Sequence, residues 1–439
     1  MTAMKLAVMG AGPSGFYAVS RILASLPLMS YPDLQVHMYD RVPAPHGLVR
    51  YGVAPDHPEV KNCVGKFDHA AQDPRFRFFG NVLVDPTCTS SYQYPKAVPL
   101  PLGLMFPYYT HFLFAQGASQ PLTLSTLPEA TPGLALVHWY TGHPAAPPTP
   151  PIPIDAINHL SIIGHGNVSL DIARLLLRDP ASLEVFEDLP RHVLQQLEKS
   201  TVKHVTIVGR RGPAQVSFTA KELRELMGQP DVSFEHVDRP LLNSARTDNE
   251  LDRPMKRILD IISKGSKVAW GTSEKSWSLR FLRSPLGCNP SKKELRLGCN
   301  TLTPHGQAEA SGKEEVVNTD AVVSSVGYRS EVSSGLQPWF DDATGRIRNS
   351  NGRVTDSLGH IVRNLYATGW AATGARGVIA AAMQSGYMAA DNVLADLQGH
   401  VGDSVPSPLP SEPLDGLPVP VDAAEDRITD YNNWRTKIM

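Results

Sequence analysis

The stretch KLAVMGAGPSGFYAVSRILASL, residues 5–26, decides the fold of this chain. It begins with an apolar run typical of a buried strand and continues with apolar residues at the three- and four-residue spacing of a helix. Between the two, Gly10, Gly12 and Gly15 match the pattern G-x-G-x-x-G. One glycine makes a tight turn, one lets backbone approach a pyrophosphate, and one lets the helix pack on the strand. A bare packing turn is the alternative, but the context favours a dinucleotide-binding unit.

A second apolar strand, expected over residues 34–39, ends at Asp40. Asp40 follows Gly15 by 25 residues, slightly more than the ~20 that is usual between the motif and its acidic residue. A carboxylate at this point accepts hydrogen bonds from the hydroxyls of an adenosine ribose and repels a 2′-phosphate. The first motif is therefore expected to bind a dinucleotide that lacks a 2′-phosphate.

The stretch HLSIIGHGNVSLDIARLLL, residues 159–177, repeats this pattern. A strand is expected over residues 160–163 and a helix up to Leu177, with Gly164, Gly166 and Ser169 at the three motif positions. Serine in place of the third glycine is small enough for close packing. Two such motifs imply two bound dinucleotides.

The next strand, in VTIVGRRGPAQVSFTAKELREL (residues 205–226), runs into Arg210 and Arg211 where the first unit has Asp40. A ribose 2′-phosphate needs charge-assisted donors, which arginine supplies bidentately. The second nucleotide is thus predicted to be NADPH rather than NADH, although two surface arginines on a turn would look the same. Residues 179–200 lengthen the usual spacing and are expected to form an inserted helical excursion.

The composition limits the remaining classes. At 439 residues the chain has room for two to three domains, and its formal charge of −2 gives no sign of nucleic-acid binding. No apolar run approaches the ~18 residues of a membrane helix, and no Arg- and Ser-rich presequence is visible before the first strand. A disulfide scaffold, a zinc ribbon, an intrinsic iron–sulfur cluster and a redox dithiol are disfavoured, because four cysteines lie far apart: Cys63, Cys88, Cys288 and Cys299.

Several stretches together resemble the adrenodoxin reductase family, the mitochondrial-type ferredoxin–NADP reductases. They are HGLVRYGVAPDHPEVKN (46–62), GHGNVSLDIARLLL (164–177), VGRRGPAQVSFTAKELREL (208–226), WSLRFLRSP (277–285), VVSSVGYRS (322–330) and TGWAATGARGVIAAAM (368–383). The resemblance implies an α/β fold with two Rossmann-like dinucleotide-binding domains. An NADPH domain, residues 117–323, would be inserted into a split FAD domain, residues 1–116 and 324–439, which ends in a proline-rich tail.

The resemblance also implies site residues. For FAD these are, with the motif glycines Gly10 and Gly15, the residues Gly12, Ser14, Asp40, Leu48, Val84, Trp370, Gly377, Val378 and Ile379. For NADPH they are His165, Gly166, Asn167, Val168, Arg210, Arg211, Glu222 and Gly377. His57 and Glu225 match positions beside the nicotinamide, where His57 would either orient a proton or water or only fix its loop. Arg253 and Arg257 match positions that bind an acidic [2Fe–2S] ferredoxin.

The implied activity is an NADPH:ferredoxin oxidoreductase. A flavin takes a hydride from NADPH and passes electrons singly to the iron–sulfur partner. A flavoprotein serving another acceptor and a degenerate nucleotide-binding protein without turnover are the alternatives. The resemblance also implies a monomer in the mitochondrial matrix, while bacterial relatives are cytoplasmic.

One segment departs from the family pattern. Four prolines interrupt the helix expected within Tyr92 to Tyr109, and a proline inside a helix costs about 3 kcal/mol. We expect either an irregular surface segment or a local reading error, which would put the wall of the FAD pocket beside Val84 in doubt. The proline-rich tail, VPSPLPSEPLDGLPVPV (residues 405–421), is expected to be extended.

Overall fold

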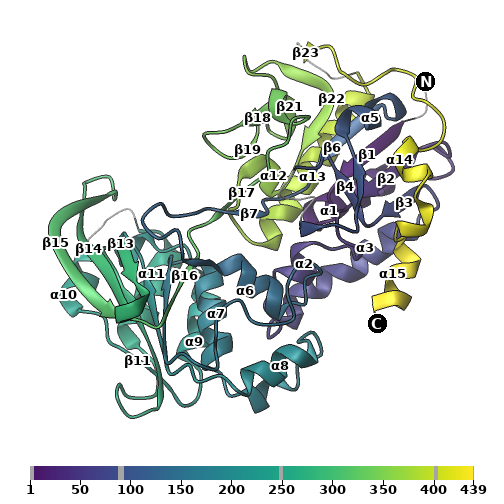
Figure 1. The fold of residues 1–439 in the computed structure, drawn as a ribbon. Helices are drawn as coiled ribbons and strands as arrows, with labels where there is room; N and C mark the ends of the chain where they lie inside the picture. The colour runs from purple at the N-terminus through teal and green to yellow at the C-terminus, as the bar shows by residue number, and fades with distance from the viewer. Residues whose placement is uncertain (1–3, 88–92, 247–250, 400–403, 439) are drawn as a thin grey trace. The chain divides into compact units, whose positions relative to one another are not determined.

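Two mainly parallel sheets organise the chain in the computed structural model, which describes residues 4–87, 93–246, 251–399 and 404–438 (Figure 1). Each sheet belongs to its own compact unit. Unit 1 comprises Met1–Val53, His57–Gln120 and Tyr328–Met439, and unit 2 comprises Ala54–Asp56 and Pro121–Gly327. Cys88 and Tyr92 lie outside the described residues.

Unit 1 contains an eight-stranded sheet. Its order is β20 (Asn349–Ser350), β21 (Arg353–Thr355), β22 (Ile361–Ala367), β6 (His111–Phe114), β1 (Lys5–Met9), β2 (Gln35–Tyr39) and β3 (Phe76–Phe79), with β23 (Ser404–Val405) also paired to β22. The strands from β22 to β3 are parallel. Strand β1 is buried along almost its whole length, as expected for a central parallel strand.

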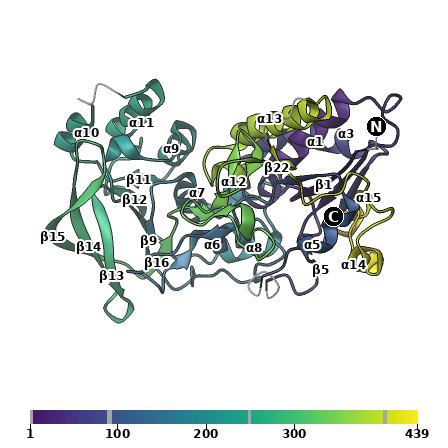
Figure 2. The ribbon, with the colours of Figure 1, turned by 90° about the horizontal axis from the view of Figure 1, so that it is seen from above.

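The helices of unit 1 include two long ones that lie side by side, α1 (Pro13–Ser25) and α13 (Ile379–Leu397) (Figure 2). The shorter helices are α2 (Leu48–Tyr51), α3 (Val64–Ala71), α5 (Leu102–Met105), α12 (Trp370–Thr373), α14 (Val419–Asp422) and α15 (Tyr431–Ile438). The 3-10 helices of unit 1 are η1 (Pro58–Cys63), η2 (Phe106–Tyr108), η6 (Gln337–Trp339) and η7 (Glu425–Arg427). The remaining strands are β4 (Val82–Val84), β5 (Val98–Leu100), β7 (Gln120–Pro121, at the unit boundary), β17 (Tyr328–Arg329), β18 (Phe340–Asp341) and β19 (Arg346–Ile347).

Unit 2 contains a six-stranded parallel sheet. Its order is β11 (Val232–Phe234), β12 (Lys275–Arg280), β10 (His204–Val208), β9 (His159–Ile163), β16 (Ala321–Ser324) and β8 (Thr131–Pro132). A separate antiparallel sheet joins β13 (Arg283–Asn289), β14 (Glu294–Leu302) and β15 (Ala308–Asn318). Both sheets are consistent with the predicted α/β class.

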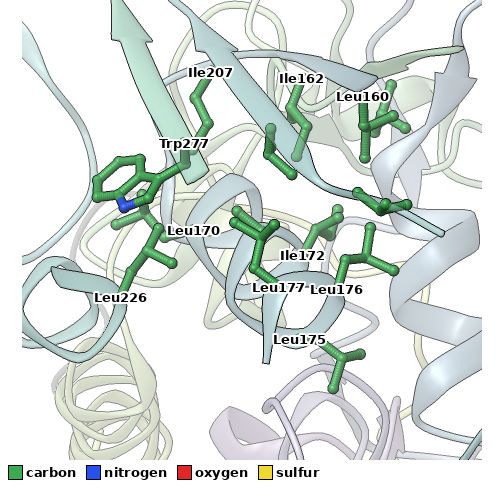
Figure 3. Close-up of a cluster of buried hydrophobic side chains, with 14 of the residues drawn as sticks. Leu160, Ile162, Leu170, Ile172, Leu175, Leu176, Leu177, Ile207, Leu226 and Trp277 are labelled. Carbon is green, nitrogen blue, oxygen red and sulfur yellow. The ribbon is translucent and has the colours of Figure 1, made fainter. Parts of the chain in front are cut away.

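The helices of unit 2 are α6 (Gly133–Tyr140), α7 (Asn167–Leu177), α8 (Arg191–Leu197), α9 (Ala220–Met227), α10 (Arg239–Arg246) and α11 (Arg253–Lys264), with 3-10 turns η3 (Pro180–Leu183), η4 (Pro213–Gln215) and η5 (Pro290–Lys292). Helix α7 packs leucine and isoleucine side chains against Leu160 and Ile162 of β9, and Trp277 of β12 closes the same core (Figure 3). This packing fixes the start of α7 directly after β9, where the second glycine motif lies.

The predicted strands and helices around both motifs are confirmed, with ends that differ by one residue. Strands β2, β9 and β10 begin at Gln35, His159 and His204, and α7 ends at Leu177 as expected. The helical excursion predicted over residues 179–200 is also present as η3 and α8.

The expectation of an irregular surface segment before Tyr109 is wrong for the described residues, 93–109. This segment forms β5, α5 and η2, and Leu100, Leu102 and Met105 are buried in the core of unit 1. Pro101 and Pro107 stand at the start of α5 and of η2. Proline is tolerated there, because the first turn of a helix has no partner for its N–H groups.

The proline-rich tail, residues 405–421, has no helix before α14 (Val419–Asp422), so the expected extended course is wrong only for its last residues. Leu409 and Val421 within it and Trp434 beyond it are buried. Lys5 donates hydrogen bonds from Nζ to the carbonyl oxygens of Leu414 and Gly416, at 3.1 and 2.7 Å. The proline-rich stretch is therefore part of unit 1.

Candidate functional site

The first glycine motif combines two sterically required glycines with one that faces open space. Gly10 has a φ of +104°, and a Cβ there would lie 2.5 Å from the carbonyl oxygen of Ala115. A Cβ on Gly15 would lie 2.7 Å from the oxygen of Gly10. Gly12, by contrast, has a φ of −80°, which any residue adopts, and a Cβ on it would meet no described atom within 4 Å. No contact within the described chain therefore explains why this residue is a glycine, and a glycine here fits the close approach of a ligand.

The second motif repeats this division. Gly164 has a φ of +128°, and a Cβ there would collide with the backbone oxygen of Ser325. Gly166 has a φ of −110° and, like Gly12, would carry a Cβ into space free of described atoms. Ser169, at the third position, is buried and donates a hydrogen bond of 2.6 Å to the carbonyl oxygen of Gly164. Serine therefore replaces glycine here because its hydroxyl has a backbone partner.

Both motifs open a helix whose first N–H groups can receive an anion. Helices α1 and α7 begin at Pro13 and Asn167, and among the described residues neither N-cap glycine provides a side-chain cap. A helix N-terminus carries unpaired N–H groups and partial positive charge, which favour a phosphate. The open space at Gly12 and Gly166 adjoins these ends.

A pocket in unit 1 opens at the carboxyl ends of β1 and β2. It is lined by Met9, Gly10, Tyr39, Asp40, Arg41, Val82, Leu83, Val84, Asp85, Gln116, Ser119, Glu331, Ser333 and Leu336. Ligands of open α/β sheets bind at this end of the strands. Of the residues predicted to contact FAD, Gly10, Asp40 and Val84 line the pocket.

The backbone holds the Asp40 carboxylate in one orientation. Its oxygens accept hydrogen bonds from the N–H groups of Ala11, at 2.7 Å, and Val42, at 3.1 Å. Burial raises the pKa of Asp40, and these amide hydrogen bonds oppose the rise. A carboxylate has about four acceptor positions, so these bonds leave acceptor capacity for a ligand hydroxyl.

The amide of Gln116 indicates that this pocket receives a polar ligand. Both its Nε2 and its Oε1 are buried without a hydrogen-bond partner among the described residues. Leaving such a group unpaired costs about 1–3 kcal/mol. The neighbouring carboxylates have partners: Asp85 accepts from the N–H of Gly335 at 2.8 Å, and Glu331 from Nη1 of Arg41 at 2.9 Å. The donors and acceptors of the pocket thus fit a nucleotide.

The stretch 368–379 approaches the first motif. Gly369, before α12, has a φ of +60°, and a Cβ on it would collide with the hydroxyl of Ser14. Two predicted FAD residues, Ser14 and Trp370, are thereby brought to one place. Trp370 donates a hydrogen bond from Nε1 to the carbonyl oxygen of Arg376 at 3.0 Å.

The predicted contacts that follow Arg376 lie at the surface of unit 1. Val378 is 53% exposed, and Ile379, half-buried, begins α13. Gly377 has a φ of +82°, and a Cβ there would lie 2.8 Å from the Cβ of Ala381. The backbone conformation and this contact therefore favour glycine at position 377, in addition to the predicted contact with a ligand.

In unit 2 the loop after β10 is attached to the second motif. The carbonyl oxygen of His165 accepts hydrogen bonds from the N–H groups of Ser217 and Phe218, at 2.8 and 3.1 Å. Oδ1 of Asn167 accepts from the N–H of Thr219 at 2.8 Å. The loop that carries Arg210 and Arg211 therefore returns to the residues predicted to bind NADPH.

Arg210 and Arg211 are exposed directly beyond the end of β10. Within the described part of the chain, neither guanidinium forms an ion pair or a side-chain hydrogen bond. Only the two backbone oxygens are engaged, by Nδ2 of Asn300 at 2.9 Å and by the N–H of Leu282 at 3.0 Å. The backbone is thus fixed while the guanidinium groups are available to an anion.

His165 is held as a neutral imidazole. Burial lowers its pKa to about 4, and Nε2 donates to the carbonyl oxygen of Ile207 at 3.2 Å. A Cβ on Gly209 would collide with the His165 ring. Gly209 therefore lets this ring pack beneath the loop of the two arginines.

The two predicted catalytic residues belong to different units. His57, in unit 1, is 6% exposed and stands before η1. Glu225, in unit 2, lies on α9 with its carboxylate 3.8 Å from Nη1 of Arg174. Glu222, on the same helix, accepts from the hydroxyl of Thr219. The positions and contacts of His57 and of the two glutamates are those within their own units.

Arg253 and Arg257, the predicted partner-binding residues, are both exposed in the first turns of α11. The carboxylate of Asp252 caps this helix by accepting from the N–H of Met255 at 2.8 Å. Their four-residue spacing places the two arginines on one face.

Sequence reasoning missed several pocket residues of unit 1, namely Arg41, Asp85, Gln116, Glu331 and Ser333. They come from four separate segments, and none belongs to a local motif. Gln116, two residues after β6, could have been suspected, because it follows a buried strand at the ligand end of the sheet.

Among the described residues, no helix is long and apolar enough to cross a membrane. No cluster of three or more His, Cys, Asp or Glu side chains there is arranged to hold a metal ion.

Comparison with known proteins gives a consistent result, although no protein-family model matches the chain. It is 35% identical over 427 residues to human mitochondrial NADPH:adrenodoxin oxidoreductase, covering 92% of this chain and 81% of that protein. It is 34% identical over 409 residues to the NADPH-ferredoxin reductase FprA of Mycobacterium tuberculosis, covering 89% and 84%. The solved structure of that FprA in complex with NADPH superposes with a TM-score of 0.80 at 29% identity, over 98% of this chain and 92% of FprA.

These identities extend over most of both proteins in each comparison. The chain therefore belongs to the adrenodoxin reductase family of NADPH-dependent ferredoxin reductases.

Proposed function

We propose that unit 1 binds FAD and unit 2 binds NADPH, and that the residues described above hold them. The protein is an NADPH-dependent oxidoreductase that delivers electrons to a ferredoxin, as its family membership indicates. In this proposal residues 1–116 and 324–439 make up the FAD domain and residues 117–323 the NADPH domain. The degenerate alternative loses its only support, because the segment before Tyr109 is packed into the core.

The observation that carries the assignment is the opposite charge at two equivalent strand ends. Each unit has a glycine motif with open space at its second glycine, at Gly12 and at Gly166. The strand after the first motif, β2, is followed directly by Asp40, and the strand after the second, β10, is followed by Gly209 and then by Arg210 and Arg211. A carboxylate disfavours a 2′-phosphate and two arginines favour it, so FAD belongs to unit 1 and NADPH to unit 2.

The groups of this chain bind and orient, while the bound flavin supplies the change from two-electron to one-electron transfer. The N-terminus of α1 would bind the pyrophosphate of FAD, and the N-terminus of α7 would bind that of NADPH. Asp40 would accept ribose hydroxyls, and the unpaired amide of Gln116 would bond the same ligand. Glu222, near the second motif, would complete the NADPH contacts.

The further contacts follow from the family resemblance. Leu48, Val84, Trp370, Gly377, Val378 and Ile379 are proposed for FAD, and His165, Gly166, Asn167, Val168 and Gly377 for NADPH. His57 and Glu225 are proposed to act beside the nicotinamide. Arg253 and Arg257 would receive the acidic surface of a [2Fe–2S] ferredoxin. We also propose that the protein is a monomer and that it is located in the mitochondrial matrix.

An anaerobic titration tests it. The purified protein is expected to show a flavin spectrum that bleaches with NADPH at far lower concentration than with NADH. A [2Fe–2S] ferredoxin added afterwards should become reduced, with a [4Fe–4S] ferredoxin and a quinone as comparison acceptors. A colourless protein that remains unreduced after FAD is added would refute the proposed function.

The two open glycines allow each nucleotide to be weakened separately. Gly12→Ala is expected to fold, because the backbone and the space accept a Cβ, yet the methyl group would press on the FAD pyrophosphate. We expect FAD binding to weaken by about 1–3 kcal/mol, roughly five- to hundredfold. Gly166→Ala should raise the KM for NADPH by a similar factor and leave the FAD content unchanged.

Flavin content of the purified variants and steady-state kinetics measure these effects. Gly65→Ala, in α3, is the matched control, because its Cβ would also meet no described atom within 4 Å. If Gly12→Ala kept its FAD and its affinity, the space at Gly12 would not be the pyrophosphate site.

A further inference from the structure

We propose that Tyr431 and Trp434 of α15, the C-terminal aromatic pair, position the loop of residues 46–50, which includes the first three residues of the short helix α2, against the first glycine motif and thereby retain FAD. This inference rests on the proposed function, since it assumes that the first motif binds FAD. The pair and the loop lie in unit 1, almost 400 residues apart in sequence.

The loop contacts the motif through its backbone. The N–H of His46 donates to the carbonyl oxygen of Ala11 at 2.8 Å. At Gly47 a Cβ would lie 2.9 Å from the Cα of Gly12. The loop and the motif therefore touch at Gly12, the glycine of the motif whose Cβ position is open. Leu48, proposed as an FAD contact, follows at the start of α2. A displacement of this loop would therefore reach the FAD site directly.

His46 adopts a conformation that needs external support. It is 1% exposed and has a φ of +86°, in a region that side-chain-bearing residues rarely enter. Such a backbone persists only where its surroundings hold it. The supports of the side chain come from α15 and from the helices around it.

Tyr431 joins His46 to Asp68 of α3. Its hydroxyl lies 2.8 Å from Nε2 of His46 and 2.7 Å from Oδ1 of Asp68. A tyrosine hydroxyl has one proton, and a carboxylate only accepts. The hydroxyl therefore donates to Asp68 and accepts from an N–H at Nε2 of His46, which fixes the imidazole tautomer and the ring orientation.

Trp434 holds both ends of the loop. It is 4% exposed, and its ring meets the His46 ring edge-on, with centroids 5.7 Å apart at 85°. The guanidinium of Arg50 lies over the same indole, 4.6 Å from its centroid. This is a cation–π geometry. One residue of α15 thus contacts His46 and Arg50, the first and last residues of the loop.

The segment before α15 is itself attached to the wall of the pocket. Thr429 and Gly80 exchange two backbone hydrogen bonds, of 2.8 and 3.1 Å. Gly80 lies just before β4, whose three valine and leucine residues line the pocket. The aromatic pair is therefore anchored beside β4, which lines the pocket proposed for FAD.

The simpler alternative is that the pair only fills a core. Tyr431 also contacts Phe16, Phe76 and Phe78, with ring centroids 6.0–6.3 Å apart. In that case a substitution would lower stability without a specific effect on FAD. The two roles predict different rates of FAD release for two variants that lose the same amount of stability.

Tyr431→Phe is the test, because it removes the hydroxyl and keeps the ring. Tyr366→Phe is the matched control: Tyr366 is also buried in unit 1 and donates to a carboxylate, that of Asp396, at 2.9 Å. Holoprotein is diluted, and the rise of flavin fluorescence gives the rate of FAD release. Visible circular dichroism of the bound flavin and the Tm are recorded on the same samples.

We expect Tyr431→Phe to release FAD about five- to tenfold faster than the unsubstituted protein and to alter the visible dichroism, as loss of one buried hydrogen bond would allow. Tyr366→Phe should lower the Tm by a similar amount and release FAD at the original rate. Asn432→Ala, on the exposed face of α15, should change nothing.

Equal release rates and equal flavin spectra for Tyr431→Phe and Tyr366→Phe would overturn the inference. If Tyr431→Phe does not fold, Trp434→Phe replaces it, with faster release again expected and an unchanged rate again decisive against the inference. An unsubstituted protein that binds no FAD would instead refute the proposed function, so the two failures are distinguishable.

Discussion

Replacing both Arg210 and Arg211 by alanine is expected to reduce kcat/KM for NADPH on the order of 10²–10³-fold and to leave NADH turnover almost unchanged. This factor corresponds to a loss of about 3–4 kcal/mol of transition-state stabilisation. Each guanidinium is exposed and has no ionic partner within the described chain, while its backbone is anchored by Leu282 or Asn300. Their removal leaves the fold intact and removes the charge-assisted bonds to the 2′-phosphate.

Steady-state kinetics with both nucleotides, at low and at moderate ionic strength, measures this effect. The loss should appear mainly in KM, because the 2′-phosphate is remote from the reacting atoms and binds equally in the ground and transition states. Arg191→Ala, an exposed arginine on α8, is the control and should change neither nucleotide. An equal loss for NADPH and NADH would show that the arginines serve the fold.

The features that the sequence predicted are those written in consecutive residues. A strand, three small residues and a helix occupy about twenty positions, so both motifs could be placed to within one residue. The charge at the end of each following strand is likewise local, as Asp40 and the arginine pair show. The backbone register then aligns these strand ends without further information, because parallel neighbours share one carboxyl edge.

The features that the sequence did not reveal depend on distant segments or on the position of a residue within an element. Gln116 and Glu331 meet in one pocket although more than 200 residues separate them. The prolines before Tyr109 suggested a broken helix, but Pro101 and Pro107 stand where helical turns begin. Whether a proline interrupts or starts a helix is decided by the helix boundary, which is the least certain part of a sequence-based prediction.

The same limit applies to a buried ion pair in unit 2, between Arg174 of α7 and Asp56, which are 118 residues apart. Nε and Nη2 of Arg174 donate to the two carboxylate oxygens of Asp56 at 2.6 and 2.9 Å, and Nη2 also donates to Asp171 at 2.8 Å. The side chains of Arg174 and Asp56 are 2% and 7% exposed. Burial lowers the pKa of Arg174, and the bonds to Asp56 and Asp171 more than offset this, so the pKa is raised overall.

Arg174→Met is therefore expected to lower the free energy of unfolding by about 3–5 kcal/mol, because Asp56 would remain buried without its two hydrogen bonds from Arg174. Urea denaturation followed by tryptophan fluorescence measures the loss. Adding Asp56→Asn to Arg174→Met should recover part of it, since the uncompensated charge is removed. Arg296→Met is the control: its pair with Glu314 has a similar distance of 2.8 Å but is about half exposed on both sides, so we expect a loss below about 1 kcal/mol. Equal losses for the two arginines would mean that burial does not determine the strength of the Arg174 pair.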